Sequence, residues 1–372
     1  MSPLIILGQD LGEISFGTDS TLEVITWNIE WFPKNGMLTV DSVGKIIESL
    51  DADLIGIQEI DDTIACRQMI DDLPGYELFM DNEWFGGLAY VYKTSAIDVQ
   101  SIYKIYDTSP YWNVFPRSPL VIEFSFEGND VIVINNHFKC CGDGLLDMDD
   151  SGDEENRRFE ASQLLKTYID EYHPLAKVLV IGDLNDLLID DNEHNVFQMF
   201  LNDPSNYSFA DYDIASGTSE NWSFYGWPSH LDHILVTNEL FDDLSSSGSE
   251  VVTLKIDEFM SDGWYDYDYY ISDHRPVGIK LAMTNTSSNT ETIELPATHI
   301  FPNPSMGNVF VDLSSIHEQV TLQLMDLTGN IIQEKTISQP QIAALDFIET
   351  PGVYVLSISN GYTYFSHKLL IQ

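Results

Sequence analysis

An apolar run that stops on polar residues, Val178-Leu-Val-Ile-Gly-Asp183-Leu-Asn185, constrains the fold of this chain most strongly. The short run is rich in β-branched residues, which predicts a strand covered on both faces, and Gly182 permits a sharp turn at its end. Asp183 and Asn185 would then stand beyond the sheet edge and point the same way, beside a hard cation. Taken alone, Gly-Asp-x-Asn is also an ordinary turn sequence.

The same pattern, an apolar run that ends on a polar side chain, occurs elsewhere in the chain. Residues 22–27 precede Asn28 and residues 53–58 precede Glu59, with a helix between them that we expect to begin at Asp41. A β-helix-β unit brings consecutive strand ends to one edge of a sheet, so Asn28 and Glu59 are expected to meet at one cation. Further polar residues at or near strand ends are Arg117, His137, Asp232, Asp273 and His274.

These residue types suit the hydrolysis of a phosphate ester. That reaction requires a cation, an oriented water and a group that assists the leaving oxygen. Asn28, Glu59 and Asp273 offer the oxygen ligands that Mg²⁺ prefers, and Asp183 with Asn185 is predicted to orient the attacking water.

The histidines supply the remaining chemistry. His137 and His274 can transfer protons near neutral pH if a carboxylate fixes the ring, and Asp232 is the expected partner of His274. Arg117 is a candidate clamp for the phosphate.

Seven segments, in this order along the chain, resemble the endonuclease/exonuclease/phosphatase superfamily with its DNase I-like fold. They are Thr26-Trp-Asn-Ile-Glu30, Ile57-Gln-Glu59, Arg117-Ser-Pro119, Asn136-His137-Phe-Lys139, Gly182-Asp-Leu-Asn185, Leu231-Asp-His233 and Ser272-Asp-His-Arg-Pro276. The resemblance implies an α+β fold, a four-layer αββα sandwich, and a phosphoesterase that depends on Mg²⁺ or Mn²⁺. It also implies roles by position: metal-side residues Asn28, Glu59 and Asp273; a water-orienting pair Asp183 and Asn185; phosphate contacts His137 and Arg117; a His274–Asp232 dyad. Which histidine acts as acid and which as base stays open.

The C-terminal part of the chain differs in composition. Residues 282–297 lose the hydrophobic pattern and predict a linker, and the short alternating strands of residues 298–372 predict a small antiparallel β-sandwich. The segments His299-Ile-Phe-Pro-Asn-Pro-Ser305, Leu327-Thr-Gly-Asn330 and Pro351-Gly-Val-Tyr-Val355 resemble the C-terminal sorting domain of type IX secretion. This implies a partner in the secretion machinery and a secreted or cell-surface protein of a Gram-negative bacterium. The predicted parts are a lead-in 1–20, a catalytic domain 21–281, the linker and the sorting domain.

Charge and hydropathy narrow the possible functions. The 60 acidic and 16 basic residues give a formal net charge of −44, which argues against tight non-specific binding of nucleic acid, because few cations can displace counterions. A nuclease would then rely on a divalent metal and local cations.

No apolar run reaches the roughly 20 residues that cross a bilayer, and residues 4–7 are too short for a signal-peptide core. We expect a monomer without a membrane span.

Three local features leave alternatives open. Cys66 either bridges Cys140 or Cys141, since adjacent cysteines rarely bridge each other, or all three thiols stay reduced. The loop Asp147–Asp153 either binds Ca²⁺ or is a solvated loop. It matches the opening of an EF-hand loop, but Arg158 stands where an EF-hand has its bidentate Glu. An aromatic cluster either floors a substrate cleft or belongs to the core: Trp222, Phe224, Tyr225 and Trp227.

The preferred function from the sequence is a secreted metal-dependent phosphodiesterase, a nuclease that hydrolyses extracellular DNA or RNA. Fold does not determine substrate, so a phosphatase or a phospholipid-headgroup phosphodiesterase on the same scaffold is the alternative. A surface binding module without chemistry is a further alternative, which the retention of Asp183, His137 and His274 disfavours.

Overall fold

The computed structural model describes residues 11–80, 87–283, 299–313, 319–326, 331–338, 341–345, 350–359 and 364–371. The chain forms two compact units, Met1–Thr286 and Ser287–Gln372, and each is described by itself. Residues 1–10 of the predicted lead-in and 284–297 of the predicted linker lie outside the described residues.

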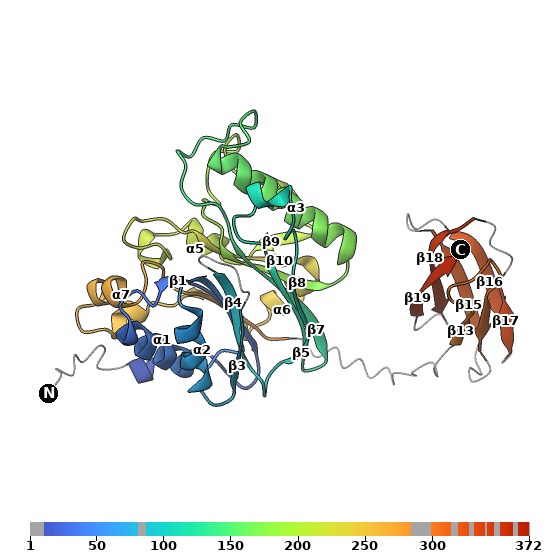
Figure 1. Ribbon diagram of the computed structural model, residues 1–372, viewed down its shortest axis with the longest axis horizontal. Helices are drawn as coiled ribbons and strands as arrows, with labels where there is room; N and C mark the ends of the chain where they lie inside the picture. The colour runs from blue at the N-terminus through green and yellow to red at the C-terminus, as the bar shows by residue number, and fades with distance from the viewer. Residues whose placement is uncertain are drawn as a thin grey trace. The chain divides into compact units, whose positions relative to one another are not determined.

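Two six-stranded mixed sheets form the centre of the first unit (Figure 1). The first has the order β11 (Glu250–Thr253), β12 (Val277–Leu281), β1 (Leu22–Phe32), β2 (Leu54–Ile60), β4 (Gly87–Lys93), β3 (Tyr76–Met80). The second has the order β5 (Asp98–Lys104), β6 (Leu120–Phe126), β7 (Asn129–His137), β8 (Lys177–Asp183), β10 (Asp232–Thr237), β9 (Tyr207–Phe209).

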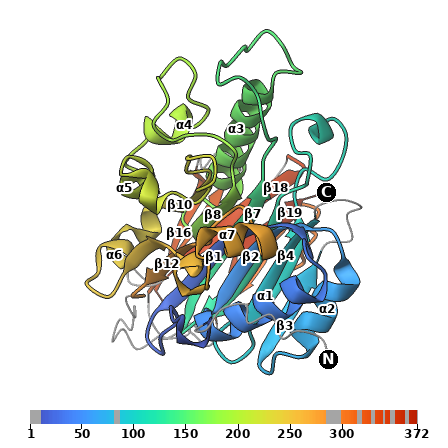
Figure 2. The ribbon, with the colours of Figure 1, turned by 90° about the vertical axis from the view of Figure 1, so that its left-hand side faces the viewer.

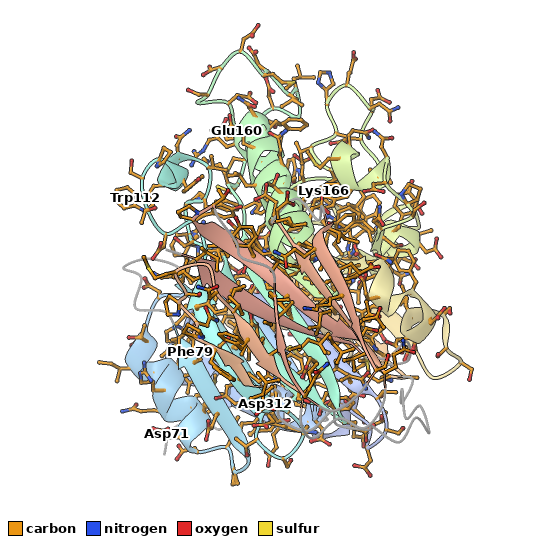
Figure 3. The ribbon with its side chains drawn as sticks, turned by 90° about the vertical axis from the view of Figure 1, so that its right-hand side faces the viewer. Asp71, Phe79, Trp112, Glu160, Lys166 and Asp312 are labelled. Atoms are coloured by element: carbon orange, nitrogen blue, oxygen red, sulfur yellow. The ribbon has the colours of Figure 1, made fainter. Side chains whose placement is uncertain are left out.

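Helices cover the outer face of each sheet (Figure 2). On the first sheet lie α1 (Met37–Leu50), α2 (Thr63–Asp71) and α7 (Trp264–Tyr270); on the second lie α3 (Glu154–Tyr172), α4 (Gln198–Leu201) and α5 (Tyr212–Ala215). Glu160 and Lys166 lie along α3 (Figure 3). The short helix α6 (Phe241–Ser245) packs at the core between the sheets. Within the described part of the chain, no helix is long and apolar enough to cross a membrane.

Alternate residues of the central strands enter different cores. In β8, Val178 and Val180 pack with α3, while Leu179 and Ile181 pack between the two sheets. Each such buried aliphatic side chain stabilises the fold by about 1.5–3 kcal/mol. Three apolar cores therefore separate four layers, helices, sheet, sheet and helices, which confirms the predicted αββα class.

The start of α1 was predicted wrongly. The helix begins at Met37 after Gly36, so Asp41 lies inside it rather than at its N-cap. Gly36 has a φ of 61°, a conformation that glycine reaches without strain, and its carbonyl accepts the N–H of Val40. The turn at Gly36 thus lets the buried face of the helix begin one turn earlier.

Strand pairing brings the predicted site residues to one end of both sheets. His137 pairs with Asp183 across parallel strands β7 and β8, and Asp183 pairs with Asp232 across antiparallel strands β8 and β10. Parallel β1 and β2 pair Asn28 with the residue before Glu59. This register follows from the predicted β-helix-β unit and from the apolar pattern of the strands.

The second unit consists of two antiparallel sheets around an apolar core, as predicted. One has the order β13 (His299–Phe301), β14 (Phe310–Asp312), β17 (Ile342–Ala344), and the other β16 (Ile331–Ile337), β15 (Val320–Met325), β18 (Gly352–Ser359), β19 (Tyr364–Ile371). The three-residue strands β13 and β17 were not predicted, because so short a segment shows no alternation.

Candidate active site

The predicted catalytic side chains line one cleft of about 490 Å³ at the shared end of the two sheets. Its polar lining includes Glu59, His137, Asp183, Asn185, Asp273 and His274. Asn28 and Asp232 are buried directly behind this lining, where Asn28 bonds to Asp183 and Glu59 and Asp232 bonds to His274. The sequence-predicted residues thus converge although they come from distant segments.

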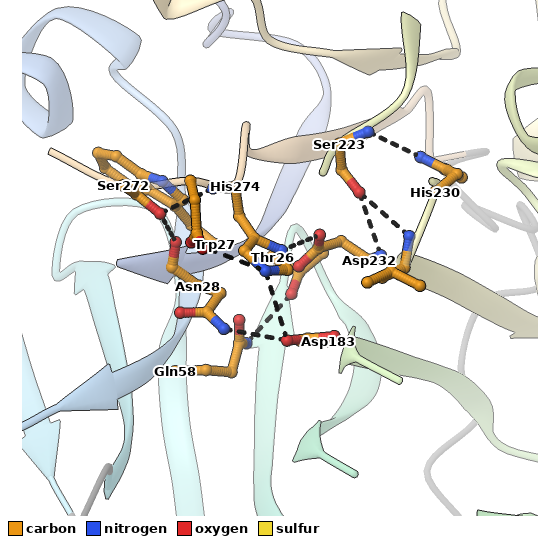
Figure 4. A network of polar contacts seen from close by, with 12 residues as sticks. Thr26, Trp27, Asn28, Gln58, Asp183, Ser223, His230, Asp232, Ser272 and His274 are labelled. Carbon is orange, nitrogen blue, oxygen red and sulfur yellow. Dashed lines mark hydrogen bonds and ion pairs between the residues drawn. The ribbon is translucent and has the colours of Figure 1, made fainter. Parts of the chain in front are cut away.

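The side-chain amide of Asn28 joins two carboxylates at the floor of the cleft. Its Nδ2 donates to Asp183 Oδ2 at 3.0 Å, as Figure 4 shows, and to Glu59 Oε1 at 3.2 Å. Its Oδ1 accepts the backbone N–H of Glu30 at 3.0 Å, which fixes the orientation of the amide. In this geometry Asn28 orients the two carboxylates and does not offer its oxygen to the cleft.

Asp183 and His137 occupy the buried centre of the cleft. Burial raises the pKa of Asp183 to about 7, although the positive charge of His274 opposes the shift. His137 is 2% exposed, and its Nε2 lies 3.6 Å from Asp183 Oδ2 and 3.7 Å from Glu59 Oε1. Burial, together with the charges of Arg117 and His274, lowers the pKa of His137 well below its usual value, so this ring is neutral near pH 7.

His274 and Asp232 form a buried pair. Nδ1 of His274 donates to Asp232 Oδ2 at 2.7 Å, and Nε2 is directed toward Asp183 Oδ2 at 3.8 Å. Burial opposes a charge on His274, but the carboxylates of Asp232 and Asp183 outweigh it and raise the pKa of the ring. Near pH 7 His137 is therefore neutral and His274 is positively charged, since their environments shift their pKa values in opposite directions.

Asn185 and Asp273 are held by backbone contacts. The N–H of Asn185 donates to Asp183 Oδ1 at 3.1 Å, and Asn185 adopts a left-handed φ of 54°. The N–H of Asp273 donates to Glu30 Oε2 at 2.9 Å, and its own carboxylate is one-third exposed. Arg117 is half-buried and near enough for its charge to act on His137, but it is not among the described residues that line the cleft.

The sequence assigned Glu30 no role in the cleft and left the roles of Phe224 and Trp227 open. Glu30 lines it beside Asp273, and burial followed by the Asp273 charge raises the pKa of Glu30. Its spacing of two from Asn28 at the same strand exit was the available signal. Phe224 packs on His274 at 4.8 Å between ring centroids, and Trp227 is 78% exposed. These two aromatics line the cleft, which is one of the two positions that the sequence had left open for them.

The cysteines and the acidic loop have defined environments. All three cysteines are free thiols: Cys66 is buried in the core, whereas Cys140 and Cys141 are exposed, so the structure has no bridge to Cys66. In the loop, Asp153 Oδ1 accepts the N–H of Asn156 at 2.7 Å and caps α3. The carboxylates of the loop accept backbone N–H groups of the same segment, and Ca²⁺ binding there stays a prediction.

A second buried cluster, Asp211, His230 and His233, has a geometry that could hold an ion, but its ring nitrogens already have partners. His233 Nε2 donates to the Asp186 carbonyl at 3.0 Å, so Nδ1, 2.6 Å from Asp211 Oδ2, must carry the second proton. Burial opposes this charge, but Asp211 raises the pKa of His233. We interpret the cluster as a buried ion pair that anchors the start of β10.

Without a divalent cation, Asp183 is expected to lower the free energy of unfolding as the pH rises from about 5 to 8, whereas the lowered pKa of His137 acts in the opposite direction below its unfolded value. The pKa of Asp183 rises from 3.8 to about 7 on folding, so in this window the folded state holds a proton that the unfolded state has lost. The loss is at most about 1.4 kcal/mol per pH unit from this group. The raised pKa of His274 lowers the free energy of unfolding further at higher pH, because the folded state there keeps a proton that the unfolded state has released.

Urea unfolding in the presence of a chelator at several pH values tests this dependence. Asp183→Asn should show a smaller pH slope than the wild type. Equal slopes would mean that Asp183 is ionised throughout the range.

Two family profiles match the chain. A profile of the Endonuclease/Exonuclease/phosphatase family matches residues 25–274. The chain belongs to this family. As a member it is a metal-dependent phosphoric ester hydrolase, which confirms the enzyme class predicted from the strand-end residues. A profile of the secretion system C-terminal sorting domain matches residues 299–372, and this tail marks a secreted or cell-surface protein.

Solved structures share the fold at low identity. D. rerio TDP2 complexed with single strand DNA product is 14% identical, with a TM-score of 0.54, and the match covers 71% of this chain and 99% of that chain. The endonuclease/exonuclease/phosphatase from Bacteroides vulgatus is 18% identical, with a TM-score of 0.50, and the match covers 70% and 98%. Truncated Caenorhabditis elegans TDP2 is 17% identical, with a TM-score of 0.50, covering 70% and 97%. No sequence among the curated proteins matched the chain.

Proposed function

We propose that this family member is a secreted phosphodiesterase that hydrolyses nucleic acid outside the cell by in-line attack of water. The observation that carries the proposal is the convergence of His137 and His274 on Asp183 in one cleft, where Nε2 of each ring lies within 4 Å of Asp183 Oδ2 and Asp232 holds His274 from behind. These groups together can orient water, contact a phosphate and protonate a leaving oxygen.

The donor set fits a hard divalent cation. Glu59 and Asp273 offer carboxylate oxygens to the cleft, and Asn28 holds Glu59 in place. Oxygen-only donors suit Mg²⁺ or Mn²⁺ rather than a thiophilic ion. When bound, the cation neutralises the non-bridging oxygens of the phosphate.

The side chains of this chain divide the remaining work. Asp183, whose pKa is raised to about 7, orients the attacking water and takes its proton, with Asn185 beside it. Neutral His137 donates a hydrogen bond to a phosphate oxygen, and cationic His274, held by Asp232, protonates the leaving oxygen. Arg117, whose charge acts on His137, is the candidate clamp for the phosphate.

Aromatic side chains favour single-stranded nucleic acid over a duplex. Trp227 is 78% exposed at the cleft and Trp31, also in its lining, is 45% exposed, so both offer ring faces on which bases can stack. The net charge of −44 disfavours binding that depends on coating a duplex backbone. The D. rerio structure of the same fold was solved with a single-strand DNA product.

The tail and the acidic loop carry finer proposals. The sorting domain directs the chain to the type IX secretion machinery of a Gram-negative bacterium. The loop Asp147–Asp153 binds Ca²⁺ if its turn opens, and otherwise remains the solvated cap of α3. The protein acts as a monomer.

A hydrolysis panel tests the function. Single-stranded DNA, duplex DNA, RNA, sphingomyelin and p-nitrophenyl phosphates would each be incubated with Mg²⁺ or Mn²⁺, and in parallel with a chelator. We expect metal-dependent cleavage of single-stranded nucleic acid above all others. Cleavage of phosphomonoesters or sphingomyelin without cleavage of DNA or RNA would instead establish the phosphatase or headgroup alternative.

Trp227→Ala should raise KM for single-stranded DNA by about 5- to 150-fold, because a base–aromatic stack contributes roughly 1–3 kcal/mol. Hydrolysis of an abasic single strand of the same length, which has no base to stack, serves as the control and should stay within about twofold. Equal losses on both substrates would show that Trp227 shapes the cleft and does not bind bases.

A further inference from the structure

Two adjacent thiols lie at the mouth of the cleft. Cys140 and Cys141 follow β7 on the loop toward α3, and both line the cleft that contains His137 and Asp183. Both are exposed, and Cys141 Sγ donates to Cys140 Sγ across 2.9 Å. The hydrolysis chemistry described above gives these sulfurs no part.

A buried framework fixes the backbone of the pair. Nη1 of Arg158, a residue that is 3% exposed, donates to the Lys139 carbonyl at 2.7 Å and to the Cys141 carbonyl at 2.8 Å. Nε of Arg158 donates to Asp186 Oδ2 at 2.7 Å. Cys141 has a φ of 74°, a left-handed conformation that these bonds support. The close approach of the two sulfurs therefore follows from the backbone, not only from side-chain rotation.

The two thiols are not equivalent. Cys140 Sγ accepts from Cys141 Sγ and from the ammonium group of Lys139 at 3.8 Å, so both hydrogen bonds converge on the Cys140 sulfur. The hydrogen bond to Cys140 raises the pKa of the Cys141 thiol. Cys140 is thus the nucleophile of the pair and Cys141 the resolving thiol.

We propose that Cys140 and Cys141 form a reversible disulfide at the mouth of the cleft, made by exchange with a small-molecule disulfide of the glutathione class. The Cys140 thiolate attacks one sulfur of that molecule, which forms a mixed disulfide and releases one small thiolate. Cys141 loses its proton to solvent, attacks the Cys140 sulfur and releases the second small thiolate. Two protein thiols are oxidised and one small disulfide is reduced to two thiols.

The bond should be easily reversed. A disulfide between neighbours closes a small ring that strains the peptide, and strained, exposed disulfides have the higher reduction potentials. Of the two sequence-based alternatives, a bridge to Cys66 is not formed, since Cys66 on α2 is buried in the core and all three cysteines are free thiols.

The reduced pair should also chelate a thiophilic probe. Soft sulfur ligands bind trivalent arsenic, whereas oxygen donors bind the hard cation. Two thiols in contact are therefore suited to a trivalent arsenical. Closing the disulfide removes both ligands at once, so the oxidised protein should not bind the arsenical.

The test uses the full chain, first reduced and then incubated with oxidised glutathione, alkylated and mapped by mass spectrometry. We expect the peptide with Cys140 and Cys141 to lose about two mass units, to resist alkylation until dithiothreitol is added, and to bind phenylarsine oxide only when reduced. Cys140→Ser and Cys141→Ser are matched controls, and each should stop at a mixed disulfide on the remaining cysteine or stay alkylatable.

Three outcomes would overturn the proposal. They are two thiols that remain alkylatable in the wild type, glutathione retained on both cysteines, or a bond between two chains. The readouts are chemical and need no substrate, so they stand or fall independently of the proposed nuclease activity.

Discussion

Asp183→Asn is expected to lower kcat/KM for a phosphodiester substrate roughly 10²- to 10⁴-fold, the range for loss of a positioned acid–base group. Asp183 is 2% exposed at the floor of the cleft, and its Oδ2 meets Asn28, His137 and His274. The amide has the same shape but cannot take a proton from water. Steady-state kinetics on bis-p-nitrophenyl phosphate with saturating metal measures the loss.

Two controls separate this effect from misfolding. Asp242→Asn removes an equal charge from the exposed start of α6 and should leave kcat/KM unchanged. The melting temperature of Asp183→Asn in chelator should equal or exceed that of the wild type near pH 8, since the variant removes a carboxylate whose pKa burial raises. Retained turnover in Asp183→Asn would assign the proton transfer to another group.

Glu59→Gln is expected to weaken the apparent affinity for Mg²⁺ or Mn²⁺ at least about 10²-fold, beyond the 10- to 100-fold typical of residues that only support a ligand. Glu59 lines the cleft with a side chain that is 14% exposed, held by Asn28 Nδ2 and the N–H of Trp31. Titration of activity against metal concentration measures the shift, and high metal should restore part of kcat.

Glu48→Gln on the exposed face of α1 is the matched control and should leave the titration unchanged. A Glu59→Gln variant with the wild-type metal dependence but a lower kcat would move Glu59 from metal binding to contact with the substrate.

Much of the site was predictable because strand geometry is local. The apolar run before Asp183 predicted a strand, and pairing in register then placed Asp183 between His137 and Asp232. The β-helix-β spacing similarly placed Asn28 near Glu59. The alternation of each strand between two cores follows from the same pattern.

What could not be predicted depends on side-chain partners. The sequence predicts Asn28 as a metal-side residue, which stays a prediction, but it did not show that the oxygen of Asn28 accepts the N–H of Glu30 or that its nitrogen bonds two carboxylates. The contact between Cys140 and Cys141 depends on Arg158, which the sequence offered only as a mismatch in a calcium loop. Such roles need three-dimensional neighbours that spacing along the chain does not specify.

Anomalous diffraction from a crystal soaked with Mn²⁺ and phosphate tests the central claim most directly. We expect one strong peak about 2.0–2.2 Å from carboxylate oxygens of Glu59 and Asp273, with phosphate between His137 and His274. A peak at Asp211, His230 and His233 instead, or no peak in the cleft at saturating Mn²⁺, would contradict it.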